Sequence, residues 1–272
     1  MMTSTATRAT RPPATAKPRR NLARIIAIET KFEFLKLFRL PIYSVAVLAF
    51  PLMFYLVFGS LYGGFEAQGM STAKYMVATF GAAGVLSAAM FAFGVGVASE
   101  RGQGWMRLKR VSPMPPLAYF ASKIGMSLLF GVLVVVIVTL AGVITQGVRF
   151  EFLEWLRLLG TLLLGVFPFA ALGLLIGFLF GPNSAPMVLN LVYMPMAFAS
   201  GLWMPITILP QSIQNIAQYL PTYHYAQLAL GAIGAQPLAS PATHYLVLAG
   251  FTVVFLSLAV WAYWRDEGKT YG

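Results

Sequence analysis

Long apolar runs alternate with short polar segments along most of the chain. Residues 41–65, 75–99 and 124–148 each contain no Asp, Glu, Lys or Arg, and a fourth such stretch lies between Arg157 and Arg265. A helix of about 20 mostly apolar residues crosses the hydrocarbon core of a bilayer. The first three runs can therefore each span a membrane once, and the last has room for three spans.

The apolar pattern favours helices over the strands of a membrane barrel. Barrel strands alternate apolar and polar residues, whereas residues 132–140 and 172–180 are apolar on every face. We place six spans at 41–62, 75–99, 118–145, 158–180, 187–203 and 243–264. The predicted fold class is an all-α integral membrane protein, because helices satisfy their own backbone groups in lipid.

Polar or interrupted segments connect the predicted spans. Residues 21–40 predict an amphipathic helix that lies in the membrane interface ahead of the first span. Residues 100–117 form a polar connector, and the prolines within 204–241 predict a broken or re-entrant segment before the last span. Residues 1–20 are interpreted as a disordered basic tail, with a cleaved targeting peptide as the alternative. Residues 21–272 are expected to form a single six-span domain.

The composition supports an integral membrane protein, and the distribution of Lys and Arg predicts how the chain is oriented in the membrane. Of the 272 residues, 58% are hydrophobic and 10% are charged, whereas about a quarter of a soluble domain is charged. Sixteen of the 19 Lys and Arg residues lie before the first span, in the connector with Lys123, or after the last span. The positive-inside rule makes this side cytosolic, so both termini are expected in the cytosol.

The basic residues behind the net charge of +11 are expected to set the orientation of the chain in the membrane and to contact anionic lipid headgroups. Nucleic acid is not an expected partner, since the basic residues are already accounted for by the positive-inside pattern.

Few residues in the spans could carry chemistry. No Asp, Glu, Lys or Arg is expected securely inside a span, which disfavours a transporter driven by an ion gradient. An intramembrane serine hydrolase stays open as one alternative, with Ser200 as nucleophile and His224 or His244 as base. The chain has no G-x-S-x-G motif to support it. A non-transporting membrane scaffold is the other alternative, and no catalytic residue, metal ligand or cofactor site is predicted.

The connector contains a candidate docking helix. Gly102 and Gly104 end the second span, and residues 105–111 can form two helical turns. The apolar side chains of these turns are Trp105, Met106 and Leu108, and the basic ones are Arg107, Lys109 and Arg110. Large apolar side chains in a polar loop favour contact with lipid or with a groove of another protein.

Two stretches of the sequence carry a pattern that is specific in its order and spacing. The first comprises Glu100-Arg101, Gly104, Val111-Ser112-Pro113, Pro116-Leu117 and Lys123. The second comprises Ser200-Gly201, Pro205, Leu209-Pro210, Ile216-Ala217, Leu220-Pro221 and Tyr223-His224-Tyr225. Together with the lead-in helix and the six spans, they resemble the permeases of type-2 ABC exporters over nearly the whole chain after residue 21. Residues 107–110 depart from the acidic-basic-apolar order that is usual in that family.

The resemblance implies a multi-pass protein of the bacterial inner membrane that exports drugs, antibiotics or lipids. It implies two partners, a cytosolic ABC ATPase that binds ATP and Mg²⁺ and a second permease copy or paralogue. The chain itself has no G-x-x-x-x-G-K-[ST] loop, so it is expected to be a transport subunit and not an enzyme.

The resemblance also implies a role for one set of residues, and the prolines of the segment 204–241 suggest a role for a second set. The coupling helix that docks on the ATPase would comprise Glu100, Gly104, Trp105, Met106, Arg107, Leu108, Lys109 and Arg110. The outer gate is expected at Pro205, Pro210, Pro221 and His224, because broken helices at membrane depth are tolerated only against protein or water.

Overall fold

The structure is a computed structural model, and it describes residues 21–39, 41–67, 69–105, 115–235 and 239–266. In chain order its elements are α1 (Leu22–Phe38), α2 (Pro41–Tyr62), β1 (Glu66–Ala67), β2 (Met70–Ser71), α3 (Thr72–Gly102), α5 (Pro116–Gln146), α6 (Phe152–Leu164), α7 (Phe167–Leu179), α8 (Ala185–Ala199), the 3₁₀ helix η1 (Ile206–Ile208), α9 (Gln211–Ala217), α10 (Pro221–Ala232) and α11 (Pro241–Asp266). The two strands pair as a short antiparallel hairpin.

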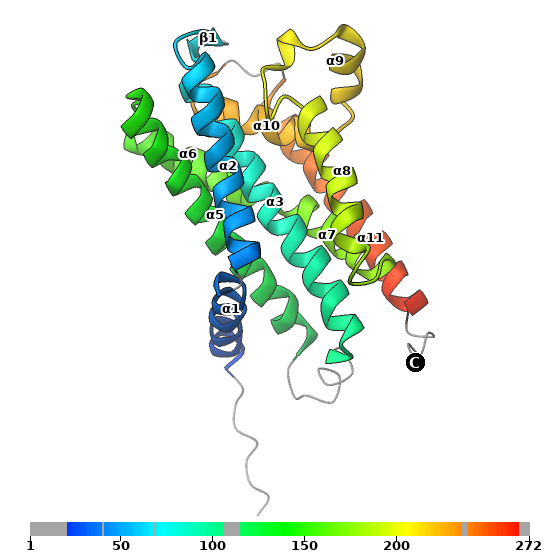
Figure 1. The fold of residues 1–272 in the computed structure, drawn as a ribbon. Coiled ribbons are helices and arrows are strands. Elements are labelled where there is room, and N and C mark those ends of the chain that lie inside the picture. The colour runs from blue at the N-terminus through cyan, green and yellow to red at the C-terminus, as the bar shows by residue number, and fades with distance from the viewer. Residues whose placement is uncertain (1–20, 40, 68, 106–114, 236–238, 267–272) are drawn as a thin grey trace, which may run out of the picture.

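Most of the helices lie side by side in one bundle (Figure 1). Four stretches of the described chain are long and apolar enough to cross a membrane: Thr72–Gly102, Leu117–Gln146, Phe152–Leu179 and Pro241–Arg265. The apolar stretches described within α2 and α8 are Val47–Tyr62 and Ala185–Ala199, and both are shorter than these four. The prediction of an all-α membrane protein is thereby confirmed, while the count of six spans stays a prediction.

The bundle has two distinct ends (Figure 1). α1 and the last turns of α3 and α11 lie at one end, which we call the α1 end. The β1–β2 hairpin and α9 lie at the other, the α9 end. Between the ends, α11 exposes apolar side chains from Leu246 to Trp264, as contact with lipid requires.

α3 lies at the centre of the bundle, and small residues allow its neighbours to approach closely. Most of its side chains are buried. A Cβ at Gly173 of α7 would overlap the Met90 carbonyl oxygen of α3, and a Cβ at Gly84 of α3 would overlap Val134 of α5. Close backbone contact of this kind is typical of packed membrane helices.

The predicted fourth span, 158–180, differs from the helices observed. The helix begins earlier, with α6, and breaks at Gly165 before α7. Pro168 at the start of α7 has no N–H for the helical ladder. Tyr225 of α10 packs its ring against Gly165 and donates its hydroxyl hydrogen to the Leu162 carbonyl at 2.8 Å. A proline and an inserted side chain are two recognised causes of a helix break.

The segment 204–241 is occupied by η1, α9, α10 and the first residue of α11. α8 ends at Ala199 and not at 203 as predicted, so a turn at residues 200–203 precedes this segment. Gly201 in this turn has a φ of +83°, which a glycine adopts without strain. α10 is buried along most of its length and contacts α3, α6, α8 and α11.

Candidate functional site

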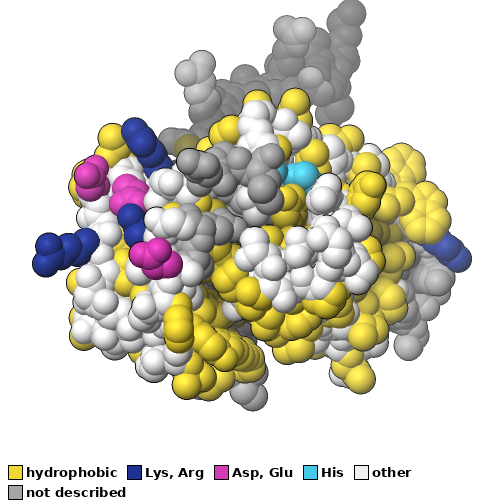
Figure 2. Space-filling model, turned by 90° about the horizontal axis from the view of Figure 1, so that it is seen from above, with side chains coloured by type: hydrophobic (Ala, Val, Ile, Leu, Met, Phe, Trp, Pro, Cys, Tyr) yellow, Lys and Arg dark blue, Asp and Glu magenta, His cyan; other side chains and the backbone are white. Residues whose placement is uncertain are grey.

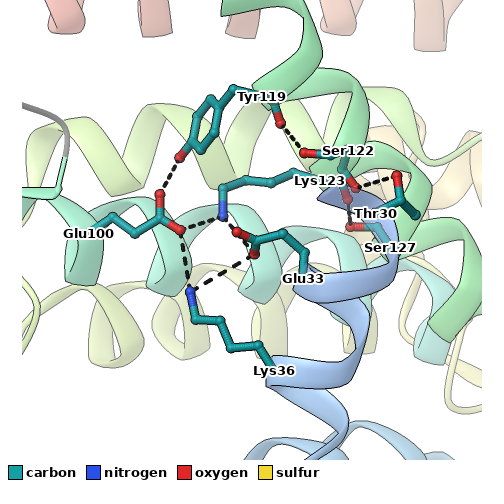
Figure 3. Close-up of polar contacts among 8 residues, drawn as sticks. All are labelled: Thr30, Glu33, Lys36, Glu100, Tyr119, Ser122, Lys123 and Ser127. Carbon is teal, nitrogen blue, oxygen red and sulfur yellow. Dashed lines mark hydrogen bonds and ion pairs between the residues drawn. The ribbon is translucent and has the colours of Figure 1, made fainter. Parts of the chain in front are cut away.

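Charged side chains from three helices meet at the α1 end (Figure 3). Lys123 of α5 lies between two carboxylates, with its Nζ 2.9 Å from Glu100 Oε1 of α3 and 3.3 Å from Glu33 Oε2 of α1. The Tyr119 hydroxyl donates to the other oxygen of Glu100 at 2.7 Å. Lys36 Nζ lies 3.5 Å from Glu100 and 4.0 Å from Glu33. We call these five residues the ion cluster.

The ion cluster is largely closed to solvent. The side chains of Lys123, Glu100 and Glu33 are 1%, 6% and 11% exposed, whereas that of Lys36 is 53% exposed. Burying an ionised group is costly unless an opposite charge and hydrogen bonds accompany it. Among the described residues, two ammonium groups contact the two carboxylates, and these contacts join α1, α3 and α5.

A second polar contact holds α1 against α5. The Thr30 hydroxyl donates to the Ser122 carbonyl at 3.5 Å, and its side chain packs on Gly125. A Cβ at Gly125 would lie 2.8 Å from Thr30 Oγ1, so a glycine is needed for this approach. Because Glu100 lies close to the end of α3, α1 is attached near the point where the connector begins.

The ion cluster bears on one expectation from the sequence. No charged side chain was expected securely inside a span; Glu100 and Lys123 are buried in α3 and α5 close to the α1 end of each helix, and the expectation stays a prediction. Sequence reasoning placed both at the limits of a polar connector and did not join either to Glu33. Since these charges pair with one another, they do not suggest a site for a coupling ion.

An apolar cavity of about 300 Å³ lies between α2, α3 and α8. Its aromatic lining residues are Phe50, Phe54, Phe80, Phe91, Tyr193 and Trp203. Phe54 stacks with Trp203 and with Phe80, at ring-centroid distances of 5.5 and 6.3 Å. Largely apolar, aromatic cavities with a few polar groups are typical of sites for small organic molecules.

Two polar side chains interrupt the apolar lining of the cavity. Ser87 donates its hydroxyl hydrogen to the Gly84 carbonyl at 2.9 Å, and Asn190 Nδ2 donates to the Pro186 carbonyl at 3.0 Å. Both donors are therefore used within their own helices. No charged residue is among the described residues that line the cavity, so it suits an apolar or amphipathic molecule better than an ion.

The structure describes three of the eight residues predicted for the coupling helix. Glu100 is buried in the ion cluster, Gly104 has a φ of +74°, and Trp105 is 52% exposed. The remaining five lie outside the described residues: Met106, Arg107, Leu108, Lys109 and Arg110. Glu100 thus faces the helix bundle, and Trp105 is the described apolar side chain that is available at the surface.

The predicted gate residues lie toward the α9 end. Pro205 and Pro210 immediately precede η1 and α9, and Pro221 is the first residue of α10. Proline suits these positions because the first N–H groups of a helix have no partner within it. The prolines therefore shape three successive short helices, and their role in a gate stays a prediction.

The fourth predicted gate residue, His224, pairs with a histidine that the gate prediction did not include. Its Nδ1 lies 2.8 Å from Nδ1 of His244 on α11, and its Nε2 lies 2.9 Å from the Gln218 carbonyl oxygen. A carbonyl oxygen accepts hydrogen bonds, so Nε2 of neutral His224 carries the hydrogen and its Nδ1 accepts from Nδ1–H of His244. We call these two residues the histidine pair.

The histidine pair is buried among uncharged groups. His224 and His244 are 8% and 1% exposed, and His244 Nε2 has no hydrogen-bond partner among the described residues. Figure 2, which views the α9 end, shows a histidine side chain well apart from most of the Lys, Arg, Asp and Glu side chains on this face. The pair thus joins α10 to α11 without an ion pair.

These contacts do not form the serine–histidine active site that the serine hydrolase alternative requires. The Ser200 hydroxyl donates to the Ala197 carbonyl at 3.1 Å. A nucleophilic serine needs a base within hydrogen-bond reach, and within the described part of the chain the two histidines bond to each other and to Gln218.

Comparison with known proteins agrees with these features. The sequence model of the family described as "ABC-2 family transporter protein" matches residues 42–261, a range that includes the cavity, Glu100 and Lys123. The chain is also 30% identical over 185 residues to "Putative transport permease YvfS" of Bacillus subtilis (strain 168), in an alignment that covers 67% of this chain and 74% of that protein. The chain therefore belongs to the ABC-2 family of transporter proteins.

Proposed function

We propose that the chain is the permease subunit of an ATP-binding-cassette exporter that moves amphipathic or lipid-like molecules out of a bacterial cell. The observation that carries the proposal is the uncharged aromatic cavity between α2, α3 and α8 in a chain of a transporter family. ATP would be bound and hydrolysed by a separate cytosolic subunit, since the sequence has no phosphate-binding loop.

The cavity gives the most direct test of this function. Ala83 is buried and lines the cavity, so Ala83→Trp would fill much of the space. We expect this variant to reach the membrane and bind its ATPase but to lose most resistance to a panel of amphipathic drugs. Leu246→Trp on the exposed face of α11 is the matched control and should export normally. Unchanged resistance in Ala83→Trp would show that the cavity does not carry cargo.

The α1 end is proposed to face the cytosol, since it adjoins the basic N-terminal segment and the connector. The chain has no cysteine, so single introduced cysteines report orientation. A reagent that cannot cross the membrane should label residues 64–71 and 211–214 from outside but not Gln103. Labelling of Gln103 from outside would contradict this orientation.

A second permease copy is proposed to pack against α2 and α8. α8 has 15 residues, fewer than the roughly 20 that cross a bilayer alone. Its Met187 and Leu191 side chains are 73% and 74% exposed. A second copy would cover them and would close the cavity from the side. Leu191→Cys should therefore form a cross-linked dimer in the membrane, whereas Val253→Cys on exposed α11 should not.

Coupling to the ATPase is proposed to involve Trp105, which is exposed at the α1 end. Truncation of a buried interface anchor commonly costs about 2 kcal/mol or more, which is roughly a thirtyfold loss of affinity. Trp105→Ala should thus weaken co-purification of the ATPase while the membrane fold persists. Lys109→Ala, which removes a charge expected at the rim, should have a modest effect that grows at low ionic strength. The reverse ranking would contradict the assignment of Trp105 as the anchor.

A further inference from the structure

Arg101 joins α3 to a different part of the bundle from its neighbour Glu100. Its Nη1 donates to the carbonyl oxygens of Gly177 at 2.6 Å and Phe180 at 3.4 Å, at the end of α7. The guanidinium also lies 5.8 Å from the ring centroid of Phe178. The last carbonyl groups of a helix have no partner within it, and the helix dipole favours a cation there. Arg101 therefore caps the end of α7 from α3.

Close packing continues from this cap to the wall of the cavity. Gly102 abuts Pro182 in the turn between α7 and α8, where a Cβ on Gly102 would overlap the proline ring. Gly94 of α3 packs on Leu189 of α8, and a Cβ there would lie 2.7 Å from Leu189 Cδ1. Leu189 is fully buried and precedes Asn190, which lines the cavity. The end of α3 is thus in contact with the turn before α8, and α3 contacts α8 itself about two turns earlier, at Gly94.

We propose that Arg101 is a positioning residue that transmits movement of the connector to the α8 wall of the cavity. The inference rests on the proposed function, because it assumes that the ATPase displaces the connector. Glu100 attaches the end of α3 to α1 and α5 through the ion cluster. Arg101 attaches the same turn to the end of α7, so one displacement acts on both sides of the bundle.

The chemistry of the guanidinium suits this role. One nitrogen contacts two carbonyl groups through charge-assisted hydrogen bonds, which are stronger than bonds between neutral groups. Closely packed helices shift as units and do not deform continuously. A displacement of the α7–α8 turn would therefore be passed along α8 to Asn190.

A single cysteine at Asn190 provides the readout, since the chain has no other cysteine. The complex with the ATPase partner would be prepared in four forms, all with Asn190→Cys: the parent, Arg101→Ala, Arg101→Lys and Arg265→Ala. The rate of labelling by a maleimide would be measured with and without a non-hydrolysable ATP analogue. ATPase binding and the thermal unfolding midpoint would be measured on the same samples.

The parent should change its labelling rate when the nucleotide binds. Arg101→Ala should reduce this change by roughly two- to thirtyfold, the range found for residues that couple sites, while it still binds the ATPase. Arg101→Lys keeps the charge but loses the planar guanidinium, so its response should be intermediate. Arg265 lies over the Trp261 ring at 5.4 Å, near the end of α11, and Arg265→Ala should respond like the parent.

Four results would overturn the inference. A response of Arg101→Ala equal to that of the parent would show that Arg101 transmits nothing to α8. A lower unfolding midpoint with an unchanged nucleotide response in Arg101→Lys and Arg101→Ala would make Arg101 a structural cap. If the parent binds no ATPase, the proposed function fails and the inference fails with it. If the parent binds the ATPase but gives no response to the nucleotide, the inference alone fails.

Discussion

The ion cluster at the α1 end and the histidine pair at the α9 end hold their helices together in different electrostatic states. At the α1 end, the ion cluster contains full charges that cancel one another. At the α9 end, the histidine pair joins α10 to α11 through neutral rings with matched hydrogens. The difference shows that buried polar contacts between helices form from charged groups at the ion cluster and from neutral rings at the histidine pair.

The sequence explains why the ends differ. No charged residue lies between Arg157 and Arg265, the stretch that contains α7 to α10 and most of α11. An ion pair within that stretch is therefore impossible. α1, α3 and α5 supply Glu33, Glu100 and Lys123, so the α1 end can bury charges that compensate one another.

The largest effect should follow from removing the central cation of the ion cluster. Lys123→Met removes the buried ammonium group that contacts both Glu33 and Glu100, and of the described ion pairs it leaves those to the exposed Lys36. Breaking a buried ion pair costs about 3–5 kcal/mol, and chemical unfolding in detergent would measure the loss. Adding Glu100→Gln should restore part of the stability, because it removes one of the two buried carboxylates that Lys123 contacted. A double variant less stable than Lys123→Met would contradict charge cancellation as the source.

A smaller effect should follow from breaking the histidine pair. His244→Leu removes the donor to His224 Nδ1 and leaves a buried acceptor unpaired, which costs about 1–3 kcal/mol. His244→Asn places an amide N–H near the position of the imidazole Nδ1–H and should lose less. Unfolding measurements on the two variants would compare them. Equal losses would indicate that ring packing, and not the hydrogen bond, carries the stability.

Acidification should weaken the α9 end. Burial lowers the pKa of His224 below its usual value, so the unfolded chain binds a proton more readily than the folded one. Stability is therefore expected to fall as the pH drops through about 6.5, the pKa of an unperturbed histidine. The double variant His224→Gln/His244→Asn should lose this dependence. If its unfolding midpoint falls as steeply between pH 7.5 and pH 5.5 as that of the parent, other groups cause the change.

The smallest effect is expected at the exposed edge of the ion cluster. The Lys36 side chain is 53% exposed, and solvent-exposed ion pairs contribute about 0–1 kcal/mol. Lys36→Met should thus unfold almost like the parent and should differ clearly from Lys123→Met. Similar losses for the two substitutions would mean that burial does not set the strength of these pairs.

The sequence predicted the helices well and their breaks less well. The run 75–99 predicts α3 because an uncharged, mostly apolar run of this length is typical of a membrane-spanning helix. The break at Gly165 was missed, because Pro168 alone does not show where a helix bends. The bend depends on Tyr225, which reaches Gly165 and Leu162 from another part of the chain.

The candidate sites were harder to predict than the fold. Glu33, Glu100 and Lys123 were visible as charges near predicted span ends, but Glu33 and Lys123 are separated by 90 residues, and their contact depends on how α1 docks. The cavity is formed by side chains from three helices, and apolar residues that line a cavity look like those that face lipid. His224 was singled out, yet its pairing with His244 depends on the placement of α10 against α11.

The break between α6 and α7 has a consequence for the order of assembly. The Tyr225 hydroxyl that bonds to the Leu162 carbonyl belongs to a residue 63 positions further along the chain, so α6 and α7 are synthesised well before the group that completes their bend. An unpaired carbonyl in lipid is costly. The bend therefore reaches its final form only when α10 docks, which makes α10 a late step in the folding of the bundle.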